Sequence, residues 1–168
     1  AGSAGATAAP AAAPPPAMGE MTMPSWFQVD NDARTVSMTI TAGSTTENNY
    51  WNFNGVTKGA MTITVPEGYT VTVELVNNDP IMAHSLGIST ETSSFSGAPE
   101  PVPAFPGAIT ENPTSMVDAT MPGETESIQF IVNQAGNYSM MCYTPGHALT
   151  GMWVYFNVSA DGSVGVQQ

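Results

Sequence analysis

Apolar and polar residues alternate along most of the chain from Trp26 onward. The alternating runs cover residues 35–41, 61–65, 70–76, 85–89, 127–132, 136–142 and 152–158. A period of two places successive side chains on opposite faces of a strand, and the Thr and Val residues that dominate these runs favour strands. No stretch has the 3.6-residue period of an amphipathic helix. The pattern therefore predicts an all-β protein.

Turn-forming residues separate the predicted strands. They include Pro66-Glu67-Gly68, Asn77-Asn78-Asp79-Pro80, Pro122-Gly123 and Gln134-Ala135-Gly136-Asn137. Pro, Gly, Asn and Asp promote tight turns, each through its own backbone preference. Short strands at this spacing are typical of two sheets packed face to face, so we expect a β-sandwich.

Two segments do not fit the strand pattern. Residues 1–23 are rich in Ala, Pro and Gly, which predicts a disordered tether before a folded domain over 24–168. Residues 90–115 are rich in Pro, Ser and Gly, and we expect a long surface excursion there, with a helical turn. The chain has neither an apolar run long enough to span a membrane nor a signal-peptide pattern, and a lipid anchor or leader before Ala1 would explain the tether.

Charge excludes one large class of functions. The 168 residues include 2 Lys and Arg against 14 Asp and Glu, a formal net charge of −12. Nucleic-acid binding needs clustered basic side chains, so it is excluded. Carboxylates lose their charge in acid. Because the chain has few positively charged side chains, little charge repulsion would then remain within it. We therefore expect stability at low pH and an acidic extracytoplasmic setting.

One segment near the C-terminus concentrates metal-binding side chains. Cys142, His147 and Met152 lie in one predicted loop, and His84 lies upstream at the start of another strand. The chain has no other Cys or His. Two His and one Cys with a weak Met ligand form the type 1 copper set, in which soft sulfurs favour Cu(I) and imidazoles suit both oxidation states. The alternatives are a buried apolar thiol at Cys142 and a structural histidine at His84.

These motifs resemble those of the cupredoxin family. The C-x4-H-x4-M spacing is similar to that of the sulfocyanin and rusticyanin branch, and Asn52-Phe53-Asn54-Gly55, Gly59-Ala60-Met61 and Val65-Pro66-Glu67-Gly68 resemble sulfocyanins. The resemblance implies a Greek-key sandwich with an N-terminal strand extension. It also implies that His84, Cys142, His147 and an axial Met152 bind one mononuclear copper, with Asn77 or Asn78 bracing the ligand loops. Residues 91–115 do not match the family.

The resemblance further implies an electron carrier rather than an enzyme. A monomer would pass single electrons to a cytochrome or a terminal oxidase, docking transiently through an exposed His147 with Met82, Pro145 and Leu149 as an apolar rim. Trp26, Trp51 and Trp153 are expected in the core and sheets. The alternative function is copper storage or delivery, which prefers open, Met-rich sites. Oxidases and nitrite reductases need further histidines, and the chain has none to spare.

Overall fold

The computed structural model describes residues 14–15 and 19–168, and this part of the chain folds into nine strands and one short 3-10 helix. The elements are β1 (Phe27–Asp30), β2 (Thr35–Ala42), η1 (Glu47–Tyr50), β3 (Thr62–Pro66), β4 (Thr70–Asn77), β5 (Gly87–Ser89), β6 (Thr125–Ile131), β7 (Gly136–Met141), β8 (Trp153–Ser159) and β9 (Gly165–Gln167). The predicted all-β class is confirmed. The short strand β9 was not predicted, because three residues are too few to show an alternation.

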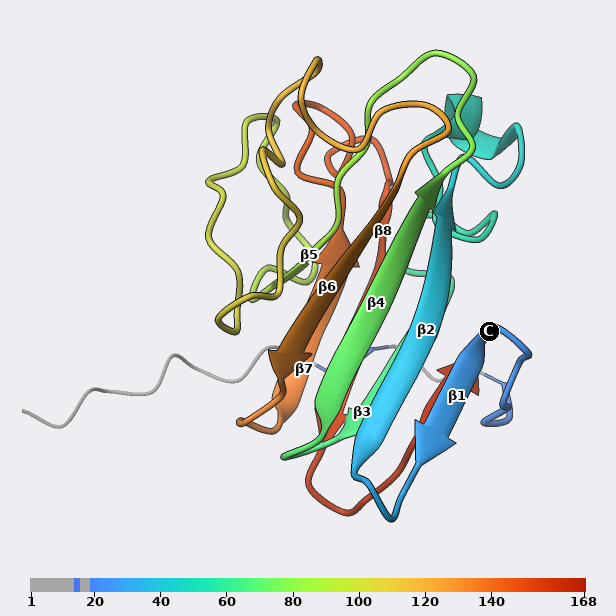
Figure 1. The fold of residues 1–168 in the computed structure, drawn as a ribbon, viewed down its shortest axis with the longest axis vertical. Helices are drawn as coiled ribbons and strands as arrows, with labels where there is room; N and C mark the ends of the chain where they lie inside the picture. Colours follow the sequence, from blue (N-terminus) through green and yellow to red (C-terminus); the bar gives the residue numbers. More distant parts are fainter. Residues whose placement is uncertain (1–13, 16–18) are drawn as a thin grey trace, which may run out of the picture.

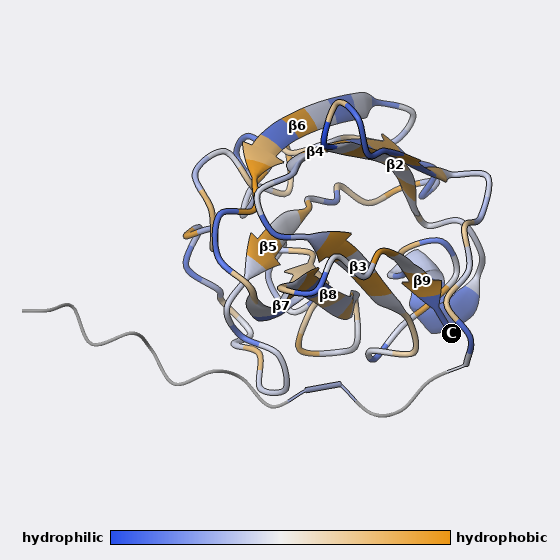
Figure 2. Cartoon of the chain, turned by 90° about the horizontal axis from the view of Figure 1, so that it is seen from below, coloured by the Kyte–Doolittle hydropathy of each residue, from blue (hydrophilic) through white to orange (hydrophobic). Residues whose placement is uncertain are grey.

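The strands form two sheets packed face to face (Figures 1 and 2). One sheet has the order β1-β2-β4-β6 and the other β5-β7-β8-β3-β9. β2 pairs in parallel with β4, and β3 in parallel with β8. Parallel neighbours cannot be joined by a hairpin, so the chain crosses between the sheets, as in the Greek-key sandwich we expected. β1 pairs antiparallel with β2 as the predicted N-terminal strand extension.

The core lies between the two sheets. Val71, Val73 and Leu75 of β4 are buried, whereas the residues between them are partly or fully exposed. In Figure 2 many strand residues are coloured orange, as hydrophobic, whereas much of the loops is white or blue. In β2, β4 and β8 the alternation of the sequence therefore predicts correctly which side chains face the core between the sheets.

The segment over 90–115 lies largely at the surface, as the sequence predicted, but the predicted helical turn is absent. Phe95, Phe105 and Ala108 of this segment are buried. Its backbone also bonds to the β5 region, where Ile88 N donates to Ala108 O at 2.9 Å. The prolines and glycines end regular structure but do not expose the apolar residues between them, and burial of those residues holds the segment against the sandwich.

The tether predicted for residues 1–23 lies largely outside the described residues, and its boundary with the domain stays a prediction. In the described part, Gly19 N donates to Gln168 O at 3.1 Å and Thr22 pairs with Val166 of β9. No helix among the described residues is long and apolar enough to cross a membrane.

Three carboxylates gather beside the start of β6. Partial burial raises the pKa of Glu126 above its ordinary value, and the negative charges of Glu111 and Glu124 add to the rise. The backbone N–H of Glu111 donates to the Glu126 carboxylate and partly offsets it. At pH values between the pKa of Glu126 in the unfolded state and its higher pKa in the folded state, the folded protein binds more protons than the unfolded protein. The resulting stabilisation is present in full below the unfolded pKa and is lost as pH rises through the folded pKa.

We therefore expect Glu126→Gln to stabilise the protein at pH 7 and to have little effect at pH 3. The expected rise in Tm at pH 7 is small, about 1–2 °C, because the carboxylate is largely solvent-screened. Thermal melting at both pH values measures it. Glu74→Gln, at an exposed position of β4, is the control for net charge. Equal effects of the two substitutions at pH 7 would contradict this account.

Candidate metal centre

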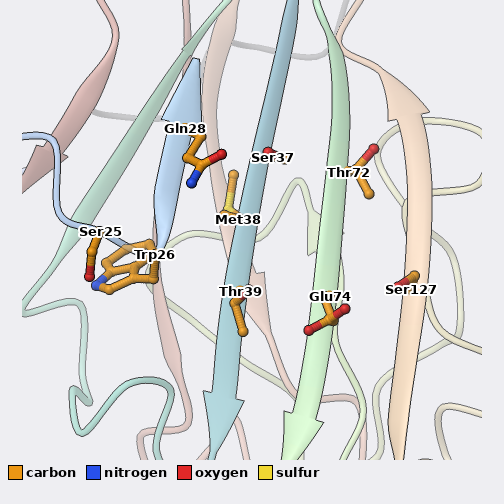
Figure 3. A pocket seen from close by; sticks show the side chains of 9 residues that line it. All are labelled: Ser25, Trp26, Gln28, Ser37, Met38, Thr39, Thr72, Glu74 and Ser127. Atoms are coloured by element: carbon orange, nitrogen blue, oxygen red, sulfur yellow. The ribbon is translucent and has the colours of Figure 1, made fainter. Parts of the chain in front are cut away.

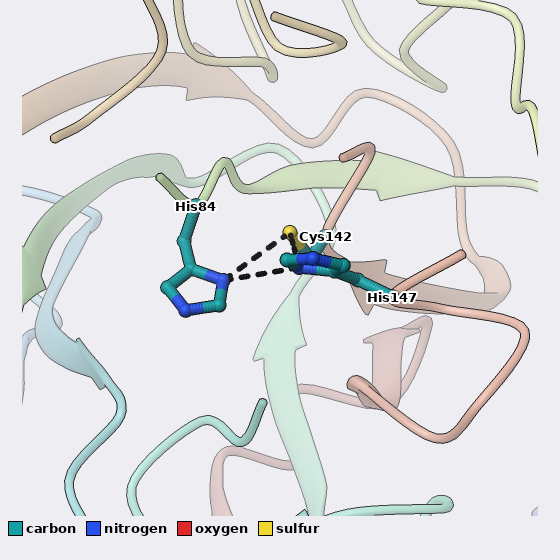
Figure 4. Close-up of side chains that lie close together, drawn as sticks. All are labelled: His84, Cys142 and His147. Carbon is teal, nitrogen blue, oxygen red and sulfur yellow. Dashed lines mark hydrogen bonds between the residues drawn. The ribbon is translucent and has the colours of Figure 1, made fainter. Parts of the chain in front are cut away.

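His84, Cys142 and His147 meet in the interior at one end of the sandwich (Figure 4). His84 lies in the loop between β4 and β5, and Cys142 directly follows β7. His147 lies in the loop that leads to β8. Cys142 Sγ is 3.8 Å from His84 Nδ1 and 3.5 Å from His147 Nδ1, and the two Nδ1 atoms are 3.2 Å apart. All three side chains are fully buried.

The three donor atoms fit a single metal ion. Points separated by these distances share a centre about 2.0 Å from each, close to the ~2.0–2.3 Å bonds that imidazole nitrogen and thiolate sulfur make to first-row metal ions. These three residues would therefore be able to hold one metal ion.

Asp79 fixes the orientation of the His84 ring. Its Oδ2 lies 2.7 Å from His84 Nε2, and both side chains are buried. A carboxylate accepts only, so Nε2 carries the proton and the Nδ1 lone pair points at the site. Burial alone would lower the pKa of His84, but hydrogen bonds and charges of Cys142 and Asp79 raise it. In the sequence, Asp79 stands out only as part of a turn, although an Asp five residues before a ligand-type His is a usable signal.

Asn77 connects the end of β4 to the loops around the site. Its Nδ2 donates to Met82 O at 2.9 Å and to Thr120 O at 2.8 Å, and its Oδ1 accepts from Asp79 N at 2.9 Å. Asn77 is fully buried, whereas Asn78 is exposed. Of the two asparagines that the sequence proposed as braces, Asn77 therefore has this role.

The environment of Cys142 favours the thiolate. Burial would raise the pKa of its thiol, but the hydrogen-bonding contacts and charges of His147 and His84 lower it well below the ordinary range. The backbone N–H of Ser85 also points at the sulfur, 3.4 Å from Sγ. Ser85 Oγ in turn accepts from Tyr143 N at 2.9 Å and ties the His84 loop to the strand that ends at Cys142.

One tight turn and two further backbone hydrogen bonds shape the loop that holds His147. Pro145 and Gly146 occupy the centre of a turn closed by His147 N donating to Thr144 O at 3.1 Å, and Gly146 has φ +82°. Pro followed by a residue of positive φ is the type II pattern, which favours Gly at this point. Met152 N donates to His147 O at 2.9 Å, and Cys142 N donates to Met152 O at 3.1 Å. These bonds bring the fully buried Met152 back beside Cys142.

One expectation about His147 is wrong, because its side chain is 0% exposed rather than solvent-facing, although Pro145 and Leu149 beside it are exposed as expected of a rim. Trp51 packs against the core as expected, and its indole also stacks on the His147 ring with centroids 3.9 Å apart and planes at 21°. Residues 91–115 also reach the loop, where Gly146 N donates to Gly97 O at 2.8 Å.

Comparisons with known proteins identify the family. Residues 24–167 match the sulfocyanin (SoxE) domain. The chain is also 30% identical over 140 residues to sulfocyanin from Sulfolobus acidocaldarius, a match that covers 78% of this chain and 69% of that protein. The protein belongs to the sulfocyanin family of cupredoxins.

Two solved cupredoxins share the fold. Rusticyanin from Thiobacillus ferrooxidans is 23% identical, with a TM-score of 0.52 over 80% of this chain and 86% of that one. Reduced auracyanin from Roseiflexus castenholzii is 22% identical, with a TM-score of 0.51 over 73% of this chain and 96% of that one. Family membership gives the protein a blue copper electron-transfer role with one type 1 copper as cofactor, and the donor set of the sulfocyanin-family site fits that ion.

A separate shallow pocket of about 240 Å³ lies on the outer face of the β1-β2-β4-β6 sheet (Figure 3). Small Ser and Thr side chains and Glu74 line it, with Trp26 and Gln28 at its β1 edge and the buried Met38 among them. Apart from Met38, the lining residues of β2 and β4 alternate with the core residues of those strands, so the pocket opens away from the buried copper donors.

Proposed function

We propose that His84, Cys142, His147 and Met152 hold one copper ion that carries single electrons between two redox partners. The observation that carries the proposal is the convergence of three buried donors at distances that suit one metal ion. Met152, which is fully buried and whose backbone lies beside Cys142, would supply its thioether as the fourth donor. The bound ion would supply the one-electron chemistry, while the protein holds the donors, excludes water and fixes the His84 proton on Nε2.

The rigidity of the donors supports rapid electron transfer. Asp79 holds one ring, the type II turn and its hydrogen bonds hold the other, and the sulfur lies at the end of a paired strand. Ligands fixed in this way cannot adopt the separate geometries that Cu(I) and Cu(II) prefer in solution. A small change in structure between the two states means a small reorganisation barrier.

The setting we propose is extracytoplasmic, with a cytochrome or a copper-containing terminal oxidase of a respiratory chain as partner. Transient docking would use the loop end of the molecule near His147, where Ile81 and Leu149 are 79% and 61% exposed. Small exposed apolar patches suit weak, short-lived complexes. Any membrane attachment would come from an anchor joined to the N-terminal tether.

Copper storage or delivery is the less favoured function. Such proteins must release the ion readily, whereas all three donors here are closed off from solvent and two of them are braced by buried hydrogen bonds. Rapid loss of copper to a mild chelator would favour storage or delivery over electron transfer.

An absorption spectrum tests the proposed site directly. The oxidised copper form should have an intense band near ~600 nm from the Cu(II)–thiolate bond, and Cys142→Ser should abolish it. Ser139→Ala, at a buried position on the same strand, is the control that keeps the band. A wild-type protein that takes up copper without this band, or a Cys142→Ser variant that retains it, would refute the assignment.

A further inference from the structure

Trp51 lies between the site and the solvent. The indole stacks on the fully buried His147 ring and is itself partly exposed. No other aromatic ring in the described residues stacks on either histidine, and the remaining ring contact of His147 is the tilted one with His84. A redox partner therefore cannot touch the buried imidazole, whereas the residue that covers it, Trp51, is partly exposed.

The backbone before Trp51 is held in an unusual conformation. Asn48, Asn49 and Tyr50 have φ angles of 53°, 59° and 68°, so three successive residues other than Gly are left-handed. Each of them costs free energy, and Tyr lacks the local hydrogen bonding that lets Asn tolerate this region. Strain of this kind persists where the surrounding structure imposes it, and it gathers at functional sites.

Side-chain amides on both sides of Trp51 impose the conformation. Asn48 Nδ2 donates to Trp51 O at 3.0 Å. The fully buried Asn52 donates from Nδ2 to Thr45 O at 3.0 Å and to Glu47 O at 2.8 Å, and its Oδ1 accepts from Gly55 N. Asn52 begins the Asn-Phe-Asn-Gly motif of the sequence, so this motif serves to position the indole.

We propose that Trp51 is the port through which electrons enter and leave the copper site. This inference rests on the proposed function and adds the route to it. One electron moves between the copper and a one-electron redox protein, which is the oxidant or reductant. The indole couples the two as a neutral bridge, so no bond forms or breaks and no proton moves. Trp51 acts through His147 and is a positioning residue, not a ligand.

The first experiment compares electron self-exchange of the copper protein with Trp51→Leu and Trp51→Phe, measured by NMR line broadening in mixtures of the two redox states. Leu covers His147 without a π system, and Phe restores one. We expect Trp51→Leu to slow exchange about tenfold and Trp51→Phe to stay within about threefold of wild type. Trp26→Leu, at another partly exposed Trp, directly before β1, should leave the rate unchanged.

The absorption band and redox potential of each variant separate a port from a merely structural residue. A slower Trp51→Leu with the band and potential of wild type supports the port. A rate equal to that of wild type at an unchanged potential overturns it, as does a slowing that Phe does not rescue. A wild-type protein without the ~600 nm band would instead refute the proposed function, so the two failures are distinguishable.

A second experiment needs no metal. Diethylpyrocarbonate acylates accessible imidazole nitrogens, and mass spectrometry locates the product on His84 or His147. In the apoprotein we expect His147 to react about tenfold faster in Trp51→Ala, which uncovers the ring, than in wild type. His84, whose Nε2 is bonded to Asp79, should stay protected and serves as the internal reference for an intact fold. Equal His147 reactivity in the two proteins would show that Trp51 does not shield the ring.

Discussion

Replacing Asp79 with Asn is expected to weaken copper binding by about 10–100-fold. The carboxylate accepts on both oxygens, Oδ2 from His84 Nε2 at 2.7 Å and Oδ1 from the backbone N–H groups of Ile81 and Met82 at 2.9 and 3.0 Å. An amide has one acceptor, so it must turn an N–H donor toward one of these donors. If the amide N–H faces His84 Nε2, the ring loses the hydrogen bond that fixes its tautomer. If it faces Ile81 and Met82, the loop that carries His84 loses the hydrogen bonds that hold its turn.

A competition titration against a chelator of known affinity measures the loss. Asp32→Asn makes the same change of charge at an exposed position in the turn between β1 and β2, and should bind copper as the wild type does. Thermal melting of the apoproteins shows how much of the effect comes from folding. Affinities that do not differ between the Asp79 and Asp32 variants would rule out the orienting role of Asp79.

Replacing Asn77 with Ala is expected to lower the free energy of unfolding by about 3 kcal/mol. The substitution leaves the buried carbonyls of Met82 and Thr120 without their side-chain donor and the backbone N–H of Asp79 without its acceptor. Each buried polar group left unsatisfied costs about 1–3 kcal/mol, and partial relaxation or an entering water recovers some of this. The loops that carry His84 and Thr120 should loosen together.

Denaturant unfolding of the apoprotein measures this change without interference from metal binding. The adjacent Asn78 is exposed, and Asn78→Ala should change the free energy of unfolding by no more than about 0.5 kcal/mol. A loss at position 77 as small as that at position 78 would mean that the three hydrogen bonds contribute little.

Sequence and structure agree best where the signal is local. Alternation along residues 35–41 and 70–76 predicted β2 and β4 to within one residue, because a strand with one buried face must repeat every two positions. The C-x4-H-x4-M spacing likewise identified the loop from Cys142 to Met152. Its turn depends on two adjacent residues, Pro145 and Gly146, and is therefore a local signal. The sequence did not show that Phe95, Phe105 and Ala108 of the segment over 90–115 are buried, because scattered apolar residues have no period.

The residues around the donors were harder to predict than the donors themselves. His84 and Cys142 stand out because few side chains have their chemistry, and the chain contains two His and one Cys in all. Asp79 is one of 14 acidic residues, and Trp51 is one of three tryptophans, so neither is distinctive by type. Asp79 is distinguished by its buried contact with the imidazole of His84. Trp51 is distinguished by the left-handed backbone before it and by its stacking on the His147 ring.

The sequence by itself determined the all-β class, the position of most strands and the identity of the candidate metal donors, because periodicity and donor chemistry are properties of residue types and spacing. Only the tertiary structure decided that His147 is buried, that Trp51 covers it and that Asp79 orients His84. These contacts join segments whose meeting depends on how the two sheets pack and how their loops close over one end. Packing and loop closure are set by the whole chain at once, so no local pattern encodes them.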